Sequence, residues 1–450
     1  MGHNNGQRAA TAATPGTRWR NWSGLEQASP AQAITPVSVD EVVAAVAGAR
    51  DSGTTLKAAG TGHSFTAIAS PGSGAQLLPG AMTGILAVDR EAMTVTARAG
   101  TQLKALNADL ERLGLALHNM GDIAEQTLAG AVSTGTHGTG GLLAAGLAAQ
   151  LAGFTIVTGT GEVLRCSRAE NTEVFALGRV GLGALGVLVD VTFMVEPLFA
   201  LEAVEQPMSW AEFHGSFDAM TAEAHHVDAY WFPHTDRLLT KRNTRLASLD
   251  EIEPLSRTKA WFDDDFLQNT AFGALTAAAN LVPGVIPRMN RMSASLLSAR
   301  TYSDVAHRVF IAERRVVFRE MEYAVPRADG LEVLRECRRA LEASDLRISF
   351  PVELRVAPAD DVALSTAYER ESFYLAFHTH HAAEHRAYFA LLEPILRAAG
   401  GRPHWGKIHS QDAASLAERY PRFGEFVALR DRLDPGRVFA NDYLRRVLGS

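Results

Sequence analysis

The segment TLAGAVSTGTHGTGG, residues 127–141, determines most of what the sequence predicts about the fold. It places five glycines and five serine or threonine hydroxyls within fifteen residues. Glycine lets the backbone approach a ligand closely and leaves N–H groups exposed, and these groups bind phosphate oxygens together with the hydroxyls. A flexible surface loop is the alternative for this segment alone. Predicted strands nearby and a second glycine-rich loop favour a ligand site.

The second glycine-rich loop is AAGTGHS, residues 58–64, which continues from a strand predicted over residues 54–59. His63 lies in this loop between Gly62 and Ser64. A loop histidine that is hydrogen-bonded to the backbone is the ordinary alternative. The flanking glycine makes the imidazole accessible to a cofactor, so His63 is also a candidate for a chemical role at the cofactor.

Helices and strands alternate in the N-terminal part. Ser38 and Glu41 predict a capping box for a helix that ends at Gly53. A second helix, capped by Thr101, is expected to end at Gly114. Strands are predicted over residues 93–99, 154–158, 162–166 and 187–195. About the first 195 residues therefore predict an α+β domain, and Pro197 marks a plausible boundary.

Gly181, Gly183 and Gly186 form a formal GxGxxG motif, but its surroundings are wrong for a Rossmann fingerprint. That fingerprint needs a strand before it and a helix after it. Here residues 174–180 lack strand alternation, and the segment that follows the motif is plainly a strand. A Rossmann NAD site is therefore not expected, whereas a close backbone contact with another nucleotide cofactor remains possible.

Two charged residues share one face of a strand predicted over residues 349–356. Strand periodicity is two, so Glu353 and Arg355 point the same way, while Val352, Leu354 and Val356 point into a core. A solvated face with a weak ion pair is the alternative. If the face lines a cavity, the pair supplies an acceptor and a fixed positive fork that can orient a polyhydroxylated substrate.

Histidines cluster at His378, His380, His381 and His385, which raises the question of zinc. No HExxH motif is present and no cysteine is near, so a metal site is not expected. Alternation along a predicted strand places His378 and His380 on one face, which suits a polar substrate cavity. The segment His404-Trp405-Gly406-Lys407 combines a base, a stacking ring and a cation, but it is a weak pattern by itself.

The composition excludes several classes of protein. The chain has 450 residues, a net charge of −7 and two cysteines far apart in sequence. There is no basic footprint for nucleic acid and no disulfide framework. We find no secretory signal and no apolar run long enough for a membrane span. The cysteine usage fits a reducing compartment, and we expect a cytoplasmic protein.

Several segments together resemble the aldonolactone oxidoreductases of the vanillyl-alcohol-oxidase flavoprotein superfamily. The resemblance runs from Asn21 nearly to the C-terminus and looks closest to the actinobacterial gulonolactone dehydrogenase/oxidase branch. The number and order of the matching stretches make the resemblance specific. They are AAGTGHSFTAIA, GDIAEQTLAGAVSTGTHGTG, GLGALGVLVDVT, EMEYAVPR, FPVELR, GRPHWGK and RDRLDPGRVFANDYLRR.

The resemblance implies an α+β fold of two domains, an FAD-binding domain of the PCMH type and a C-terminal substrate-binding cap. The expected divisions are a disordered tail over residues 1–20, the FAD domain over 21–196, the cap over 197–430, and a C-terminal segment over 431–450 that returns to the FAD domain. In covalent members the histidine of the GxGHS segment bonds to the 8α-methyl group of the flavin. That residue is His63 here.

The resemblance also implies roles for individual residues. Glu353, Arg355 and Lys407 match the active-site residues, and His378 and His380 are weaker matches for substrate contacts. The residues expected around the cofactor, besides His63, are Gly60, Thr61, Gly62, Ser64, Asp122, Thr127, Gly130, Thr134, Gly135, Thr136, His137, Gly186 and Val187.

The implied reaction is hydride transfer from a sugar carbon to flavin N5. For a gulono- or galactono-1,4-lactone this carbon is C2, and the product tautomerises to ascorbate. Gly121 stands where a small residue tends to accompany oxidase activity, which favours O2 as acceptor over another redox acceptor. An alditol oxidase that acts on xylitol or sorbitol is the alternative within the superfamily. A metal-binding protein and a flavin-binding module without catalysis are alternatives from other classes.

Overall fold

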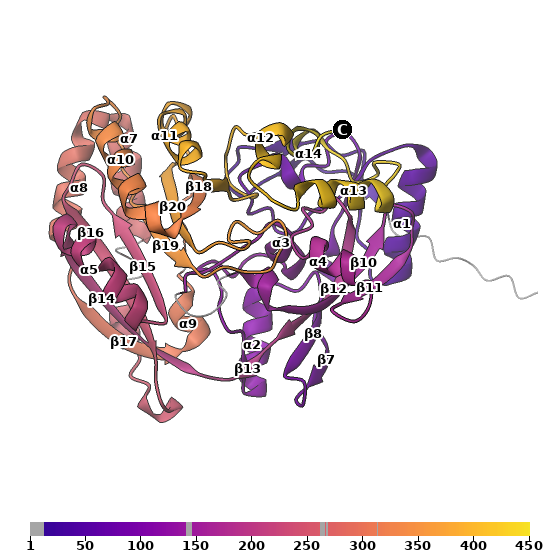
Figure 1. The fold of residues 1–450 in the computed structure, drawn as a ribbon, viewed down its shortest axis with the longest axis horizontal. Helices are drawn as coiled ribbons and strands as arrows, with labels where there is room; N and C mark the ends of the chain where they lie inside the picture. The colour runs from indigo at the N-terminus through magenta and orange to yellow at the C-terminus, as the bar shows by residue number, and fades with distance from the viewer. Residues whose placement is uncertain (1–12, 141–145, 262–265, 267–268, 313) are drawn as a thin grey trace, which may run out of the picture.

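Two halves built around separate sheets face each other in the computed structural model, which describes residues 13–140, 146–261, 266, 269–312 and 314–450. A four-stranded and a five-stranded sheet lie in the N-terminal half, and one eight-stranded sheet forms the other half (Figure 1). The α+β class predicted from the sequence is confirmed.

The N-terminal half combines a partly parallel sheet with an antiparallel one. In the first sheet β5 and β4 both pair in parallel with β6, and helix α1 (Val39–Ser52) connects β4 to β5. In sheet order these strands are β1 (Ala13–Pro15), β4 (Gln32–Ile34), β6 (Ala75–Leu77) and β5 (Leu56–Ala58). The second sheet runs β11 (Val163–Ser167), β10 (Leu151–Thr158), β12 (Gly186–Met194), β8 (Thr94–Arg98) and β7 (Ile85–Asp89).

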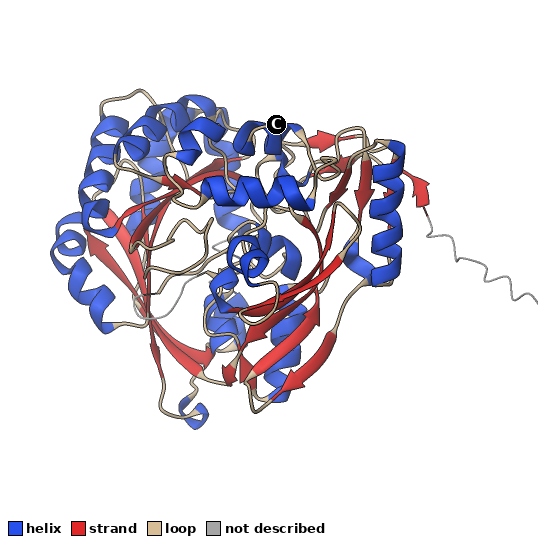
Figure 2. Ribbon diagram, turned by 45° about the vertical axis from the view of Figure 1, so that its right-hand side comes forward, coloured by secondary structure: helices blue, strands red, loops and turns tan. Residues whose placement is uncertain are grey.

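The eight-stranded sheet has one face covered by helices and the other turned to the N-terminal half (Figures 1 and 2). Its order is β17 (Arg300–Val305), β14 (Ala200–Ser209), β16 (Arg237–Arg245), β15 (His226–Trp231), β19 (Val352–Ala357), β20 (Ser372–His380), β18 (Phe318–Pro326) and β21 (Arg402–Pro403). The covering helices are α5 (Trp210–Glu223), α10 (Gly330–Glu342) and α11 (Arg386–Ala398). Val352, Leu354 and Val356 join the core beneath these helices, as strand alternation predicts.

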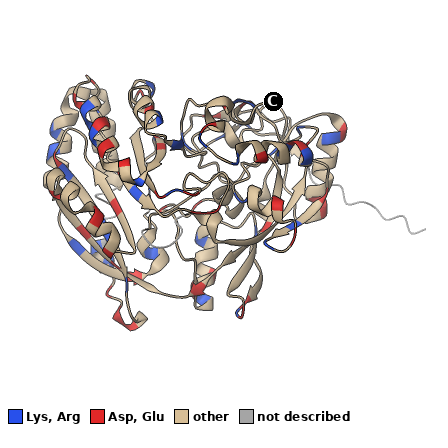
Figure 3. Ribbon diagram, in the orientation of Figure 1, with Lys and Arg blue, Asp and Glu red and all other residues tan. Residues whose placement is uncertain are grey.

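Charged residues of both signs are spread along the chain in both halves of the molecule (Figure 3). Within the described part of the chain, no helix has the length and the apolar character that crossing a bilayer demands.

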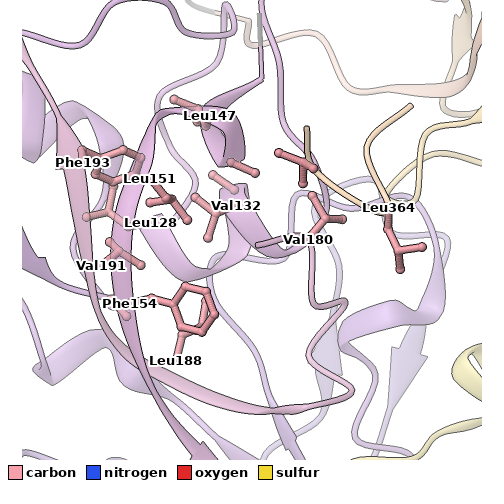
Figure 4. Close-up of a cluster of buried hydrophobic side chains, with 14 of the residues drawn as sticks. Leu128, Val132, Leu147, Leu151, Phe154, Val180, Leu188, Val191, Phe193 and Leu364 are labelled. Atoms are coloured by element: carbon pink, nitrogen blue, oxygen red, sulfur yellow. The ribbon is translucent and has the colours of Figure 1, made fainter. Parts of the chain in front are cut away.

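A core cluster anchors the glycine-rich segment that begins at Thr127. Leu128 and Val132 of helix α3 (Leu128–Ser133) pack with side chains of β10 and β12, among them Phe154 and Val191 (Figure 4). All four side chains are nearly inaccessible to solvent. Because the helix is fixed by apolar burial, Gly130 inside it and the glycines that follow it are held against the rest of the fold.

Local capping differs from the sequence prediction at two helices. Ser38 accepts a hydrogen bond from the Glu41 N–H, but the Glu41 carboxylate accepts from Val37 instead of Ser38, so only half of the capping box forms. Thr101 does not cap the helix α2 (Leu103–Leu113), because its hydroxyl accepts a hydrogen bond from the Gly84 N–H. Gly53 and Gly114 end their helices in the left-handed conformation, as predicted.

The chain returns to the N-terminal core at its end. Side chains from Leu416 onward, including Tyr420 and Phe426, belong to the same cluster as α3. Contacts with this core therefore already occur before residue 431, where the sequence analysis placed the start of the returning segment, and Trp405 belongs to the same cluster. The three helices concerned are α12 (Ala413–Ala417), α13 (Phe423–Leu433) and α14 (Asp442–Leu448).

Short elements complete the fold. Residues 13–20 contain β1 and β2, and β1 pairs with β4, so this part of the predicted disordered tail forms sheet structure. Residues 1–12 and part of the apolar run 142–154 lie outside the described residues. The remaining elements are β2 (Trp19–Arg20), β3 (Gln27–Ala28), β9 (Leu115–Ala116), α4 (Thr172–Gly178), β13 (Glu196–Pro197), α6 (Arg257–Ala260), α7 (Phe272–Leu281), α8 (Ile286–Ser295) and α9 (Ala306–Phe310).

A half-buried ion pair joins the two halves at Glu196. Arg245, at the end of β16, donates two hydrogen bonds of 2.6 Å to the Glu196 carboxylate, and His118 lies 2.9 Å from the same carboxylate. Although burial acts in the opposite direction, the hydrogen bonds from His118 and Arg245 lower the pKa of Glu196 to about 2. The carboxylate therefore stabilises the folded state in its ionised form.

Replacing Glu196 with glutamine is expected to lower the free energy of unfolding by about 1–2 kcal/mol at pH 7, a figure reduced for partial exposure. The folded pKa is depressed, so this stabilisation is present above about pH 4.5 and is lost as the pH falls towards 2. Urea unfolding of the wild-type protein and of Glu196→Gln, at pH 7 and at low pH, measures this difference in the free energy of unfolding. Glu173→Gln, at an exposed pair with Arg432, is the control and should change little. Equal stability of wild type and Glu196→Gln at pH 7 would contradict the prediction.

Candidate functional site

A deep pocket lies between the glycine-rich loops and the inner face of the eight-stranded sheet, and we call it the glycine-lined pocket. The empty space in it is roughly 1350 Å³ when space continuous with solvent is counted. Of the residues predicted from the sequence, it is lined by Gly60, Thr61, Gly62, His63, Ser64, Gly121, Asp122, Thr127, Gly130, Thr134, Thr136, His137, Gly186, Val187, Arg355 and Lys407.

The two glycine-rich segments touch each other at Gly60. A Cβ atom added there would lie 2.3 Å from the Thr127 hydroxyl oxygen. Thr127 in turn caps α3, because its hydroxyl accepts a hydrogen bond from the Gly130 N–H. Glycine is therefore required for the close approach of the two segments, and together they leave a cradle of backbone and hydroxyl groups that suits a diphosphate.

The GxGxxG segment contributes to the pocket without being a Rossmann motif. Strand β12 follows it, as predicted, and the segment before it, where the sequence lacked strand alternation, forms helix α4. Gly183 and Gly186 line the pocket, and Gly181 does not. At Gly186 the backbone φ is +159°, and an added Cβ would lie 2.4 Å from the Val157 carbonyl oxygen. A larger residue would therefore disturb this wall of the pocket.

Lys57 is a buried cation of the pocket that the sequence analysis missed. It belongs to β5, and its Nζ donates a hydrogen bond of 3.0 Å to the Gly183 carbonyl oxygen. Burial lowers its pKa to about 7, against the opposing charge of Asp434. A charged residue in an otherwise apolar predicted strand was the feature of the sequence that could have identified Lys57. In the pocket wall this amine suits an anionic ligand, whose charge would favour the ammonium form.

His63 follows β5 and lines the pocket beside an aromatic ring. Its imidazole stacks on Trp22 with ring centroids 5.8 Å apart, and its Nδ1 lies 3.1 Å from the Thr61 hydroxyl oxygen. Burial lowers the pKa of His63, the nearby charge of Glu125 opposing it. The ring is therefore neutral at pH 7 and keeps a nitrogen lone pair that can act as a nucleophile.

Arg355 lies at the centre of a buried charge cluster. Its guanidinium donates hydrogen bonds to Asp228 at 2.9 Å and to Glu353 at 2.7 Å, and it lies 3.4 Å from Asp122. Arg314 forms an ion pair with Asp122 and lies 3.6 Å from Glu353. Although burial acts to raise it, the two arginines hold the pKa of Asp122 well below its usual range. The cluster fixes one guanidinium at the pocket wall.

Part of this cluster was predicted and part was not. Glu353 and Arg355 share a strand face as expected, and Glu353 supports Arg355 from behind without lining the pocket itself. Asp228 and Arg314 were missed, because β15 and the chain before β18 reach the cluster only through tertiary pairing.

Lys407 is held between two glutamates that the sequence analysis did not single out as site residues. Glu320 and Glu322 alternate along β18, and their side chains are 3% exposed. Lys407 forms a close ion pair with Glu320 and lies 4.0 Å from Glu322. Two acids at alternate positions of an apolar strand, in EMEYAVPR, were the available signal.

His378 and His380 share a face of β20, but neither lines the glycine-lined pocket. His378 Nδ1 donates to the Pro351 carbonyl oxygen, and its Nε2 lies 3.5 Å from Glu320 and 3.9 Å from Glu353. His378 thus belongs to the charge cluster. His380 Nδ1 instead accepts a hydrogen bond from the Ala382 N–H. Gly135 also lies outside the pocket and lines a small cavity behind His137.

The geometry does not favour a metal ion. Over the described ranges, one group of three potential ligands occurs, His137, Glu322 and His404. His404 Nδ1 accepts a hydrogen bond from the Gly406 N–H, so in the neutral ring Nε2 carries the proton and cannot bind a metal. The Lys407 ammonium beside Glu322 also repels a cation. Of the other histidines considered, His385 accepts a hydrogen bond from Arg319.

Comparisons with known proteins match both halves of the chain. Residues 30–167 match the FAD binding domain, and residues 191–447 match the family described as D-arabinono-1,4-lactone oxidase. The chain is 38% identical to L-gulono-1,4-lactone dehydrogenase of Mycobacterium tuberculosis, over 96% of this chain and 99% of the relative. It is 32% identical to L-gulonolactone oxidase of Bos taurus, over 96% and 98%.

A solved structure supports the fold. A cholesterol oxidase from Brevibacterium sterolicum superposes with a TM-score of 0.82 over 100% of this chain and 99% of that chain, at 16% identity. At that identity the likeness concerns the fold alone, and it confirms the predicted FAD-linked oxidase architecture.

Proposed function

Because this chain belongs to the family of FAD-linked aldonolactone oxidoreductases, we propose that it oxidises a sugar 1,4-lactone of the L-gulono-1,4-lactone type at C2. The family resemblance predicted from the sequence is confirmed, and the protein is an FAD-dependent oxidoreductase acting on CH–OH groups. The proposed product is a ketolactone that tautomerises to an ascorbate-type compound. The observation that carries the proposal is the placement of Arg355 and Lys407 in the wall of one pocket with the glycine-rich loops.

The charge clusters support specific roles. FAD, when bound, supplies a hydride acceptor at N5. We propose that Arg355 and Lys407 hold the oxygen of the carbon that is oxidised and stabilise negative charge as it develops. Glu353 would bind a substrate hydroxyl and orient Arg355, to which it is already hydrogen-bonded. His378 and His380, which lie on the same side of the sheet but outside the glycine-lined pocket, would contact the more distant hydroxyl groups of the substrate.

We further propose that His63 carries the flavin covalently through the 8α-methyl group. The neutral imidazole in the pocket wall supports this role. Residues 60–64 and 127–137 would hold the pyrophosphate, although Gly135 faces a neighbouring cavity. Gly186 and Val187 would contact the adenosine half. The division into an FAD domain over 21–196, a cap over 197–430 and a C-terminal segment over 431–450 that returns to the FAD domain remains part of this proposal.

Gly121 supports O2 as one acceptor. An added Cβ would lie 3.0 Å from the His137 carbonyl oxygen and 3.5 Å from Thr136 Cγ2, so a side chain here would fill space beside the pocket. We infer that glycine leaves this approach open to O2. Relatives named dehydrogenase and relatives named oxidase both occur, so another redox acceptor is the second candidate. The two buried free cysteines are compatible with the proposed cytoplasmic location.

Anaerobic mixing with candidate substrates tests the function. L-Gulono-1,4-lactone is expected to bleach the flavin absorbance at least ~100-fold faster than xylitol, because a site that hydrogen-bonds one substrate rejects a poorly matched one by such factors. D-Arabinono-1,4-lactone, included because of the family match, should react measurably. The open-chain acid L-gulonate is the control for the lactone ring. Faster bleaching by xylitol than by both lactones would instead identify an alditol oxidase.

A further inference from the structure

The contact between His137 and Glu322 lies in the wall of the glycine-lined pocket, and the roles proposed above do not use it. His137 Nε2 and Glu322 Oε1 are 2.5 Å apart, and the two side chains are 4% and 3% exposed. β18 presents Glu322, and the glycine-rich segment after α3 presents His137, from positions 185 residues apart. Both groups are thus removed from water and still border the ligand space.

The hydrogen bonds fix how many protons this pair holds. His137 Nδ1 is 2.9 Å from the Gly138 carbonyl oxygen, which can only accept, so Nδ1 carries a proton. The short contact from Nε2 to Glu322 then contains one further proton. The pair is either imidazolium with carboxylate or imidazole with carboxylic acid, and its net charge is zero in both forms.

The neighbouring charges favour the ionised form of Glu322. Although burial acts to raise it, the charges of His137 and Lys407 hold the pKa of Glu322 well below its usual range. His404 faces the pair but is neutral, because burial lowers its pKa to about 4. Tyr374 stacks on His137 at 4.0 Å between ring centroids and shares a hydrogen bond with Thr366. Glu320, on the same strand, is engaged by Lys407.

One oxygen of Glu322 is left available. Oε1 meets His137, while Oε2 accepts no hydrogen bond from the described residues and lies 4.0 Å from Lys407. The other carboxylates of the site are committed to cations. Glu320 is bound to Lys407, and Asp122 is bound to Arg314. Glu353 is bound to Arg355 through Oε1 and does not line the pocket. Glu322 Oε2 is therefore a vacant position for one proton beside the pocket.

We propose that Glu322, held by His137, takes up the proton released by the substrate hydroxyl and keeps it in the pocket until the flavin is reoxidised. The hydrogen of the C–H bond of the alcohol would go to the flavin as hydride, together with both bonding electrons. The O–H proton goes to Glu322 as the carbonyl forms, and it leaves with the electrons on reoxidation. Reduction adds negative charge to a low-dielectric pocket, which raises the proton affinity of a nearby carboxylate. The inference rests on FAD binding and not on the identity of the sugar.

The test measures the flavin midpoint potential from about pH 6 to 8, with the holoenzyme reduced slowly by xanthine and xanthine oxidase in the presence of a reference dye. No sugar is needed, so the outcome is independent of the proposed substrate. The wild-type protein is expected to take up one more proton per flavin than Glu322→Gln. Its potential should therefore fall more steeply with pH, by ~30 mV per pH unit for a two-electron couple.

Two further variants complete the design. In His137→Gln the imidazolium is lost, so Glu322 is expected to be protonated before reduction, and the midpoint potential should again fall less steeply with pH. If Glu322→Gln does not bind flavin, the result with His137→Gln decides. Glu393→Gln is the matched control, because Glu393 is buried outside the pocket, where it accepts hydrogen bonds from Tyr323 and Ser410. It should keep the wild-type slope. Equal slopes in wild type and Glu322→Gln, or a wild-type slope that corresponds to the proton on the flavin alone, would overturn the proposal.

Discussion

Replacing Arg355 with lysine is expected to slow reduction of the flavin by substrate about 10²–10³-fold, while the protein remains yellow. Lysine keeps the positive charge, but it cannot reproduce the planar fork that meets Asp228 and Glu353 together. The charge would remain near the pocket without its fixed direction. The loss should therefore appear in the rate of the chemical step, measured by anaerobic stopped-flow absorbance with the lactone that reacts fastest.

A matched control separates this effect from a general effect of the substitution. Arg245→Lys changes an arginine that also donates two hydrogen bonds to carboxylate oxygens, both of Glu196, at the junction of the two halves and away from the pocket. It is expected to lower stability and to leave the rate of flavin reduction unchanged. A normal rate in Arg355→Lys would contradict the proposed role of the guanidinium. Loss of bound flavin from Arg355→Lys would show that Arg355 supports the cofactor instead of the substrate.

The residues found from the sequence are those whose role is visible in a local pattern. Glycines at close spacing predicted the loops that meet at Gly60 and Thr127. Period-two alternation predicted that Glu353 and Arg355 share a strand face. Both patterns follow from backbone geometry within one segment, so they are legible without knowledge of the tertiary fold.

The residues that were missed are joined by contacts between distant segments. Glu322 meets His137 across 185 positions, and Arg355 meets Asp228 across 127. Nothing local distinguishes Asp228 from other acids on a strand, because its role arises only when β15 pairs with β19. Competition explains the Thr101 error in the same way. Its hydroxyl could have capped the following helix, but the fold brings the Gly84 N–H close, and the hydroxyl accepts a hydrogen bond from that group instead.

Replacing His63 with alanine is expected to abolish covalent attachment of the flavin completely. The wild-type polypeptide should stay fluorescent after acid precipitation, whereas flavin from the variant should pass into the supernatant. The physical reason is that bond formation at the 8α-methyl group needs a neutral nitrogen nucleophile in contact with the ring, and burial keeps the His63 imidazole neutral. The contact with Trp22 restricts the orientation of that ring.

His214→Ala is the control for this experiment, because His214 lies on α5, on the far side of the eight-stranded sheet from the glycine-lined pocket. Its flavin should remain with the polypeptide. If the wild-type protein itself releases all its flavin into acid, attachment is non-covalent and His63 serves only to pack against Trp22. If His63→Ala retains flavin on the polypeptide, another side chain forms the bond. In both cases the pocket would still bind FAD through its glycine-rich walls, because those contacts do not depend on the imidazole.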